Sequence, residues 1–355
     1  MDDWKQNLKK TEPYTPGEQL NIKGLIKLNT NENPYLPSPK VREALENLEP
    51  YGLKLYPNPD GEPLRSGLAK YHGVDAENIF LGNGSDEVLA FAFPAFFNSE
   101  RPILFPEITY SFYKVWAEFF RVPYKTVPMG KGFEIDVSGF FAENGGILIA
   151  NPNAPTGMGL GLRAIESILE KNPGSVVILD EAYVDFGGET ALPLLKKYEN
   201  LLIVRTFSKS RALAGMRIGY AIGGKLLIDT LNGVKNSFNS YTINRASAAA
   251  GCAALKDEKY FSECVKKVIA TRERAIGTLR EMGFSVCPSS ANFIFVTNEN
   301  LPAAKLQEFL RGSGILVRHF PAPGIDNYLR ISIGSDYEMD RLFEKINEFA
   351  KQGTA

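Results

Sequence analysis

The sequence predicts an α/β fold with a mainly parallel sheet in one domain and a smaller α+β domain beside it. Short apolar runs recur at residues 103–105, 147–150, 176–179 and 201–204, and each leads into a polar turn, as buried parallel strands do. A chain of 355 residues can bury a large core and usually divides into two domains. The last third reads as strand, helix, strand, strand and helix, which indicates the smaller domain.

The composition is that of an ordinary globular protein and argues against several kinds of partner. Hydrophobic residues make up 44% and charged residues 23%, and the net charge of −1 provides no basic surface for nucleic acid. The longest apolar run, residues 88–97, contains Pro94 and is too short to span a bilayer, so we expect a core helix and no membrane segment. Three separated cysteines and the absence of an apolar leader in MDDWKQNLKK favour reduced thiols in a cytoplasmic protein.

The N-terminal arm, residues 1–39, is rich in asparagine, proline and other polar residues. It contains Tyr14 in TEPYTPG and Asn31 in LNTNENP, and this composition predicts an irregular arm held by turn-forming asparagines. An amphipathic segment at residues 38–48 follows. Tyr56 then stands in LYPNP, a context that by itself predicts no more than packing in a turn.

A glycine-containing turn follows the apolar run at residues 79–81. The sequence GNGSDE brings Ser85 and Asp86 to the start of a helix, where free backbone N–H groups and the helix dipole bind anions. Glu87 stands where GxGxxG would have its third glycine. A dinucleotide-binding fold is therefore disfavoured, and a phosphate site remains.

Residues 204–219, VRTFSKSRALAGMRIG, carry the main chemical signal of the chain. A lysine chosen at random is usually solvated on the surface. Lys209, however, is flanked by the hydroxyls of Thr206 and Ser208 and followed by Arg217, a set that suits a phosphate group. A nucleophilic amine beside a phosphate anchor is what a pyridoxal phosphate enzyme needs, because the cofactor is held by its phosphate while its aldehyde forms a Schiff base with the lysine.

A carboxylate stands at the end of the preceding apolar run, in the sequence DEAY. Asp180 could be a helix cap, a metal ligand or the partner of a pyridine nitrogen. In the last case, a separation of roughly 4 Å at an effective dielectric near 20 gains about 4 kcal/mol. That energy corresponds to about three pKa units on the ring nitrogen, enough to keep the ring protonated. Tyr183, three residues on, could then reach the cofactor's phenolic oxygen.

These motifs together resemble a known family. DEAY, a lysine 29 residues after Asp180 in TFSKS, and an arginine in GMRIGY occur in the order found in fold type I pyridoxal-phosphate-dependent aminotransferases, and most closely resemble the histidinol-phosphate aminotransferases. The resemblance implies a seven-stranded, mainly parallel sheet sandwiched by helices. It also implies that Lys209 holds the cofactor covalently, that Asp180 pairs with the ring nitrogen, and that Ser208 and Arg217 hold the phosphate.

The resemblance implies further cofactor contacts. The backbone of Ser85 and Asp86 would bind the cofactor phosphate, and Thr206 would belong to the same cofactor-binding set. Tyr110 would stack on the ring, although by itself an aromatic residue there is more often part of a core. Tyr56 would reach the cofactor phosphate of a neighbouring subunit, which implies a homodimer with shared active sites.

On the substrate side, the resemblance implies four contacts. Tyr14 and Asn31 of the arm would line the substrate site, Arg330 in YLRISIG would bind a carboxylate, and Arg318 in ILVRHF would bind a substrate phosphate. Either arginine could instead be an ordinary charge at a strand edge.

One position departs from the family pattern. An asparagine normally stands immediately before Pro-Thr-Gly and bonds the cofactor's phenolic oxygen, but here the residue is Ala154. Tyr183 could carry that contact alone, or Asn153 could approach from one residue earlier, and the sequence leaves both possibilities open.

The expected organisation is an arm at residues 1–39 that packs on the active site and the small domain, a large cofactor-binding domain at 40–245, and a linking helix with a small C-terminal α+β domain at 246–355. The implied reaction, in histidine biosynthesis, transfers the amino group of L-histidinol phosphate to 2-oxoglutarate. Threonine-phosphate decarboxylases and aromatic aminotransferases share the motifs, and a non-catalytic pyridoxal-phosphate-binding regulator is an alternative of another class. The chain has no GxSxG motif and only two histidines, which disfavours a hydrolase triad or a histidine-based metal site.

Overall fold

The larger sheet of the computed structural model, which describes residues 3–352, contains seven strands in the order β2-β8-β7-β6-β5-β3-β4. Strands β7, β6, β5, β3 and β4 are mutually parallel, and β8 is antiparallel to both of its neighbours. The prediction of a seven-stranded, mainly parallel sheet is confirmed. The strands are β2 (Ile79–Asn83), β3 (Ile103–Pro106), β4 (Tyr124–Val127), β5 (Gly146–Ala150), β6 (Val177–Asp180), β7 (Leu201–Thr206) and β8 (Ile218–Gly223).

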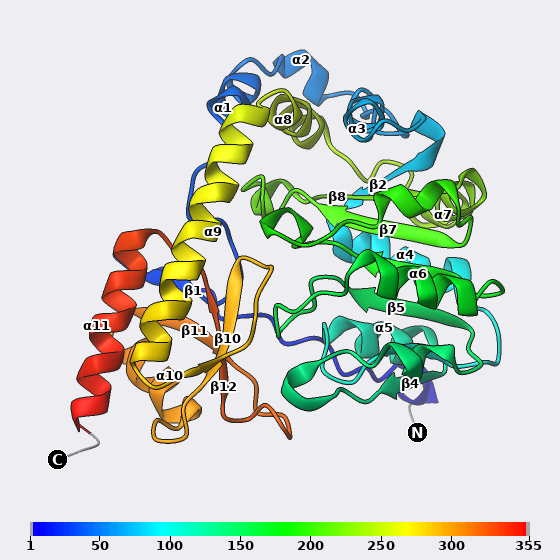
Figure 1. Cartoon of the computed structure of the whole chain (residues 1–355). Helices are drawn as coiled ribbons and strands as arrows, with labels where there is room; N and C mark the ends of the chain where they lie inside the picture. The colour runs from blue at the N-terminus through cyan, green and yellow to red at the C-terminus, as the bar shows by residue number, and fades with distance from the viewer. Residues whose placement is uncertain (1–2, 353–355) are drawn as a thin grey trace.

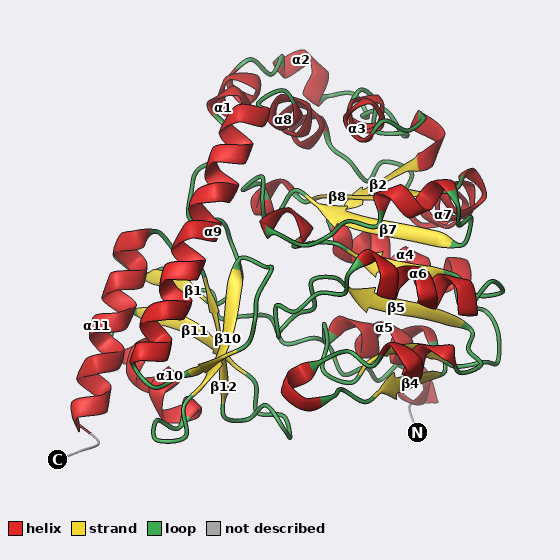
Figure 2. Ribbon diagram, viewed as in Figure 1, coloured by secondary structure: helices red, strands yellow, loops and turns green. Residues whose placement is uncertain are grey.

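Alternate residues of the central strands enter two different cores. Ile147 and Ile149 of β5 belong to the apolar cluster on one face of the sheet, whereas Leu148 and Ala150 belong to the cluster on the other. Because helices cover both faces (Figure 2), side chains on both sides are apolar, and the strands appear in the sequence as unbroken apolar runs. One face is covered by α4 (Ser85–Phe96), α5 (Phe112–Phe120) and α7 (Lys225–Phe238), and the other by α3 (Leu64–His72), α6 (Leu162–Lys171) and α8 (Arg245–Leu255).

The smaller sheet has the order β1-β11-β12-β10-β9 and a core of its own. Its first strand comes from the N-terminal arm and pairs in parallel with β11, with Ile26 opposite Ile315. The predicted smaller α+β unit is therefore confirmed, and it includes a strand from the beginning of the chain. Its elements are β1 (Ile26–Leu28), β9 (Ser285–Val286), β10 (Phe293–Thr297), β11 (Ile315–His319), β12 (Tyr328–Ser332), α10 (Ala303–Gly312) and α11 (Asp336–Gln352).

The helix α9 (Glu258–Glu281) connects the two units (Figure 1). It starts beside α8, α1 (Pro39–Glu46) and α2 (Pro50–Leu53), and then packs against the smaller sheet. The helices expected at residues 38–48 and 88–97 correspond to α1 and α4. Within residues 3–352, no helix is both long and apolar enough to cross a membrane, and no group of three or more histidine, cysteine or acidic side chains is arranged to hold a metal ion.

Candidate active site

A cavity of about 460 Å³ lies where the ends of β6 and β7 meet the N-terminal arm and the smaller sheet. Carboxyl ends of neighbouring parallel strands meet at one edge of a sheet, which is where α/β proteins commonly place their ligands. The cavity is lined by thirteen of the fifteen residues singled out in the sequence: Tyr14, Asn31, Ser85, Asp86, Tyr110, Asp180, Tyr183, Thr206, Ser208, Lys209, Arg217, Arg318 and Arg330.

Lys209 lies in the turn that follows β7. The turn is fixed locally because the hydroxyl of Thr206 accepts the backbone N–H of Ser208 at 3.0 Å. Lys209 Nζ donates to the backbone carbonyl of Thr30 at 3.2 Å and lies 5.8 Å from the centre of the Tyr183 ring. The lysine amine therefore points into the cavity and is held by a neutral acceptor of the N-terminal arm.

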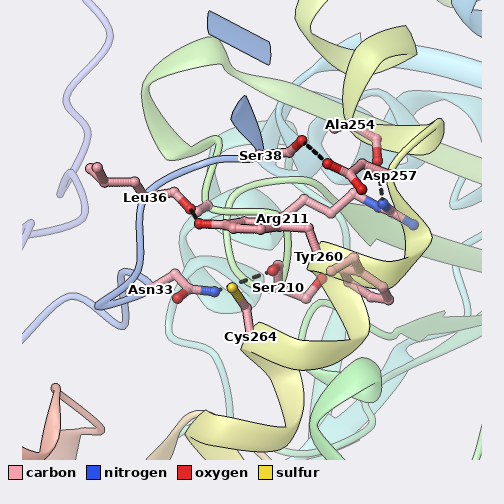
Figure 3. A pocket seen from close by; sticks show the side chains of 11 residues that line it. Asn33, Leu36, Ser38, Ser210, Arg211, Ala254, Asp257, Tyr260 and Cys264 are labelled. Carbon is pink, nitrogen blue, oxygen red and sulfur yellow. Dashed lines mark hydrogen bonds between the residues drawn. The ribbon is translucent and has the colours of Figure 1, made fainter. Parts of the chain in front are cut away.

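The side of this turn that faces away from the cavity is tied to the arm and to α9 (Figure 3). The Asn33 side-chain amide donates to the backbone carbonyls of Lys209 and Ser210 at 3.1 and 3.2 Å. Around a cavity with room for about one water molecule, Ser38 donates to Asp257, and the Tyr260 hydroxyl donates to a backbone carbonyl of the arm. The backbone of the lysine turn is thus fixed from behind while its amine stays at the cavity.

Asp180, the last residue of β6, is only 5% exposed. One carboxylate oxygen accepts the Tyr113 hydroxyl at 3.0 Å, and the other accepts the backbone N–H of Ala182 at 3.2 Å. Burial raises the pKa of Asp180 to about 6, the two hydrogen bonds oppose this rise, and the nearby carboxylates of Asp86 and Glu181 add to it. A cationic ligand atom at this wall would compensate the buried negative charge.

A candidate anion site lies in the same cavity, where α4 begins. The first backbone N–H groups of a helix have no acceptor within the helix, so those of Ser85 and Asp86 are available to a ligand. Arg217 lies alongside, with Nη1 3.4 Å from Ser208 Oγ and Nη2 3.2 Å from an Asp86 carboxylate oxygen. A Cβ atom on Gly219 would lie 2.2 Å from the Ser85 nitrogen, so glycine is required for this close approach.

Two guanidinium groups from the smaller sheet face the cavity without an acidic hydrogen-bond partner among residues 3–352. Arg330 Nη2 donates to the backbone carbonyl of Asn29 at 3.0 Å, whereas its buried Nε has no hydrogen-bond partner. Burial lowers the pKa of Arg330 from its usual value. Arg318 donates to the backbone carbonyls of Thr15 and Pro16 at 3.0 and 3.2 Å. Because neutral carbonyls leave both positive charges uncompensated, this side of the cavity suits an anionic ligand.

Aromatic side chains and one amide complete the lining. The Tyr110 hydroxyl donates to Asp86 at 2.9 Å, and burial raises the pKa of Tyr110 well above its usual value. Tyr14 lies 6.3 Å from Tyr110 between ring centres. The Asn31 side-chain amide donates to the Tyr183 hydroxyl at 3.0 Å, so Asn31 contacts a residue of the site rather than pointing freely into it.

Two predicted site residues lie elsewhere. Asn153 is fully buried. Its amide oxygen accepts the Thr109 hydroxyl at 2.7 Å, and its amide nitrogen donates to the backbone carbonyl of Ile108 at 2.9 Å. The amide is engaged in holding its own loop, and the residue that lines the cavity is Ala154. Asn153 is therefore not brought to the place where it could replace the missing asparagine.

Tyr56 is 78% exposed and stacks on Tyr241, with 4.5 Å between ring centres. It does not line the cavity of its own chain. Its expected contact is with the cofactor of a second subunit, so the contact remains a prediction.

Three residues that the sequence analysis did not select contact the predicted ones. Tyr113 bonds Asp180, Ser332 bonds Asn31, and Glu32 lines the cavity beside Lys209. Ser332 follows Arg330 by two residues in β12, a spacing that places both side chains on one face of the strand, and this periodicity is the signal from which Ser332 could have been found. Tyr110 precedes the first residue of α5, so no helical spacing links it to Tyr113.

Comparisons with known proteins identify the family of this chain. Residues 23–346 match the family model described as aminotransferase class I and II. The histidinol-phosphate aminotransferase of Clostridium acetobutylicum is 50% identical over 97% of this chain and 98% of its own length. That of Acinetobacter baumannii is 49% identical over 98% of this chain and 97% of its own length.

A solved structure supports the same relationship. The histidinol-phosphate aminotransferase of Sinorhizobium meliloti, in complex with pyridoxal-5'-phosphate, superposes with a TM-score of 0.84 at 25% identity and covers 92% of this chain and 91% of that one. The resemblance found around residues 180–217 is thereby confirmed. The chain belongs to the class I and II aminotransferases, the family that includes these histidinol-phosphate aminotransferases.

Proposed function

We propose that this chain is a pyridoxal-phosphate-dependent aminotransferase that takes the amino group of L-histidinol phosphate and transfers it to 2-oxoglutarate. The observation that carries the proposal is one cavity whose lining combines the Lys209 amine with two candidate anion sites. The α4 N-terminus and Arg217 form one site, and Arg318 and Arg330 form the other. A phosphorylated cofactor requires one such site, an anionic substrate requires the other, and the amine is needed to bind the cofactor aldehyde. The relatives at 49–50% identity, named histidinol-phosphate aminotransferases, support this donor.

The residues present fit pyridoxal 5'-phosphate. The phosphate suits the N–H groups of Ser85 and Asp86 together with Ser208 and Arg217, a contact made possible by Gly219. Buried Asp180 has the charge needed by a protonated ring nitrogen, and the aromatic ring of Tyr110 and the hydroxyls of Tyr183 and Thr206 complete the set. When bound, the cofactor supplies an electron-accepting ring joined to the carbon that exchanges the amino group.

The chain's own groups then have distinct tasks. Lys209 Nζ would hold the cofactor aldehyde covalently and, as a free amine, would remove the proton from the amino-bearing carbon as general base. Asp180 remains ionised to hold the ring nitrogen protonated. Arg330, through the unpartnered Nε, and Arg318 bind the substrate's phosphate or the carboxylates of the oxo acid.

The active site is proposed to be completed by a second copy of the chain. Tyr56 carries a large exposed aromatic ring held in place by Tyr241, and Arg245 donates to the Tyr56 backbone carbonyl at 3.0 Å. A homodimer would place this tyrosine against the cofactor phosphate of the partner. Tyr56→Phe should then weaken cofactor binding without changing the fold, and mixing it with Lys209→Ala subunits should restore partial activity in the mixed dimers.

The test of the proposed reaction is a half-reaction on the purified holoenzyme. Histidinol phosphate is added without any oxo acid, the absorbance of the lysine-bound cofactor is followed, and carbon dioxide is assayed in parallel. We expect the absorbance band to disappear without carbon dioxide release and to return when 2-oxoglutarate is added. A band that does not respond to histidinol phosphate, or responds only to threonine phosphate with release of carbon dioxide, would contradict the proposed donor.

A further inference from the structure

The cavity wall at Ala154 lacks the amide that the family pattern would place there, and Asn153 is engaged elsewhere. Ala154 forms a small apolar cluster with Ala291 and Phe293, and Tyr183 packs against this cluster, with its ring 5.0 Å from that of Phe293. The Tyr183 ring therefore packs on an apolar wall that offers its hydroxyl no hydrogen-bond partner. A chain of hydrogen bonds through Asn31 and Ser332 determines where the proton of the Tyr183 hydroxyl points.

That chain begins at the backbone of Asn31 and passes through Ser332. The Asn31 N–H donates to Ser332 Oγ at 2.8 Å, and the Ser332 hydroxyl donates to Asn31 Oδ1 at 2.9 Å. Asn31 Nδ2 then donates to the Tyr183 hydroxyl oxygen at 3.0 Å. Asn31 and Ser332 are each only 1% exposed, and Asn292 fixes the Asn31 backbone carbonyl at 3.0 Å.

The donors in this chain run in one direction. Ser332 Oγ accepts the backbone N–H of Asn31 and gives its single proton to the amide oxygen, and the amide nitrogen faces Tyr183. An amide nitrogen donates and does not accept. The Tyr183 oxygen must therefore accept this bond, and its own proton must point to another acceptor.

We infer that Asn31 and Ser332 are positioning residues that make the Tyr183 hydroxyl a hydrogen-bond donor to the phenolic oxygen of the bound cofactor, in place of the direct amide contact absent at Ala154. The inference rests on the proposed function, because the acceptor belongs to pyridoxal phosphate. It also gives Asn31 a role other than the substrate contact expected from the sequence. Asn31 acts through Tyr183, and its left-handed backbone, with φ of 58°, holds the amide at that position.

The decisive variant is Asn31→Asp, which keeps the shape of the side chain but replaces the amide donor with an acceptor. Tyr183 would then donate to the new carboxylate and could not donate to the cofactor. We expect the apoenzyme to bind pyridoxal phosphate about tenfold more weakly or worse, as for loss of a hydrogen bond to a charged group. Ser332→Ala, which frees the amide to rotate, should give a smaller loss in the same direction. Equilibrium dialysis of the apoenzyme measures both without requiring turnover.

A cofactor analogue separates positioning from a general structural role. With 3-deoxypyridoxal phosphate, which lacks the phenolic oxygen, native protein and Asn31→Asp should bind equally well. In a Tyr183→Phe background, Asn31→Asp should produce no further loss for pyridoxal phosphate. Equal weakening of both ligands by Asn31→Asp would overturn the inference, as would unchanged binding of pyridoxal phosphate. Failure of the native protein to bind pyridoxal phosphate at all would instead overturn the proposed function.

Discussion

The Tyr113 hydroxyl provides a quantitative test of how the buried carboxylate is controlled. It donates to Asp180 at 3.0 Å in a fully buried position on α5, and Asp180 has a pKa of about 6. Burial is the main reason for this high pKa, with the charges of Asp86 and Glu181 adding to it, and the Tyr113 bond opposing it. Removing the hydroxyl with Tyr113→Phe should therefore raise the pKa of Asp180 further.

The size of the effect follows from the bond. A hydrogen bond to an ionised group contributes about 1.5 to 3 kcal/mol, and 1.36 kcal/mol corresponds to one pH unit, so the pKa of Asp180 should rise by about one pH unit or more. The ionised form of Asp180 pairs with the protonated ring nitrogen of the cofactor. The affinity for the cofactor should therefore be highest above the pKa of Asp180 and should be lost as the pH falls through it. At pH 6, a rise of one unit lowers the ionised fraction about fivefold.

The assay is the affinity of the apoenzyme for pyridoxal phosphate between pH 5 and 8.5. The midpoint of the loss should lie about one pH unit higher in Tyr113→Phe than in the native protein. Tyr220→Phe is the matched control, because it also deletes a buried hydroxyl, which lies 3.0 Å from His72 Nε2 and outside the cavity lining. A midpoint that is unchanged in Tyr113→Phe, or that moves equally in the control, would refute the reasoning.

Three further predictions concern other residues of the site. Lys209→Ala should abolish covalent attachment of the cofactor, and persistence of the lysine-bound absorbance band in this variant would exclude the assignment. Arg318→Ala should reduce kcat/KM for histidinol phosphate far more than for phenylalanine, and equal losses would show that Arg318 does not bind the substrate phosphate. Because the pKa of Asp180 rises from 3.8 to about 6 on folding, the contribution of Asp180 to apoenzyme stability should fall by about 3 kcal/mol as the pH rises between these values. Asp180→Asn lacks this contribution, so its free energy of unfolding relative to that of the native protein should increase by that amount between urea titrations at pH 4 and pH 7.

The elements of the large sheet were predictable because each strand is buried on both faces. An apolar run as short as residues 201–204 that leads into a polar turn favours a buried strand, and the polar residues after it then fall at the sheet edge. The pairing of β1 with β11 was not predictable, since a three-residue strand carries little pattern and its partner lies almost 290 residues away.

The candidate site shows the same limit at the level of side chains. Lys209, Asp180 and Arg217 could be selected because each follows or precedes a recognisable strand, and strand ends converge. The direction of a side-chain amide depends on its partners in space, and neither the engagement of Asn153 with Thr109 nor that of Asn31 with Ser332 is encoded in local spacing. The sequence could thus name which residues meet at the cavity but not which of them contact one another.

The N-terminal arm explains why both units are needed for one reaction. Its strand β1 belongs to the smaller sheet. Three of the five residues that follow this strand, however, form hydrogen bonds with candidate active-site residues of the larger unit. Thr30 accepts the Lys209 amine, Asn31 joins Tyr183 to Ser332, and Asn33 fixes the backbone of Lys209. The two proposed anion sites also come from different units, with the α4 N-terminus and Arg217 beside the larger sheet and Arg318 and Arg330 on the smaller. A substrate bound to both the cofactor and these arginines would therefore bridge the two units. Because the arm contacts Lys209 and Tyr183, it would couple the relative position of the two units to the placement of these two side chains.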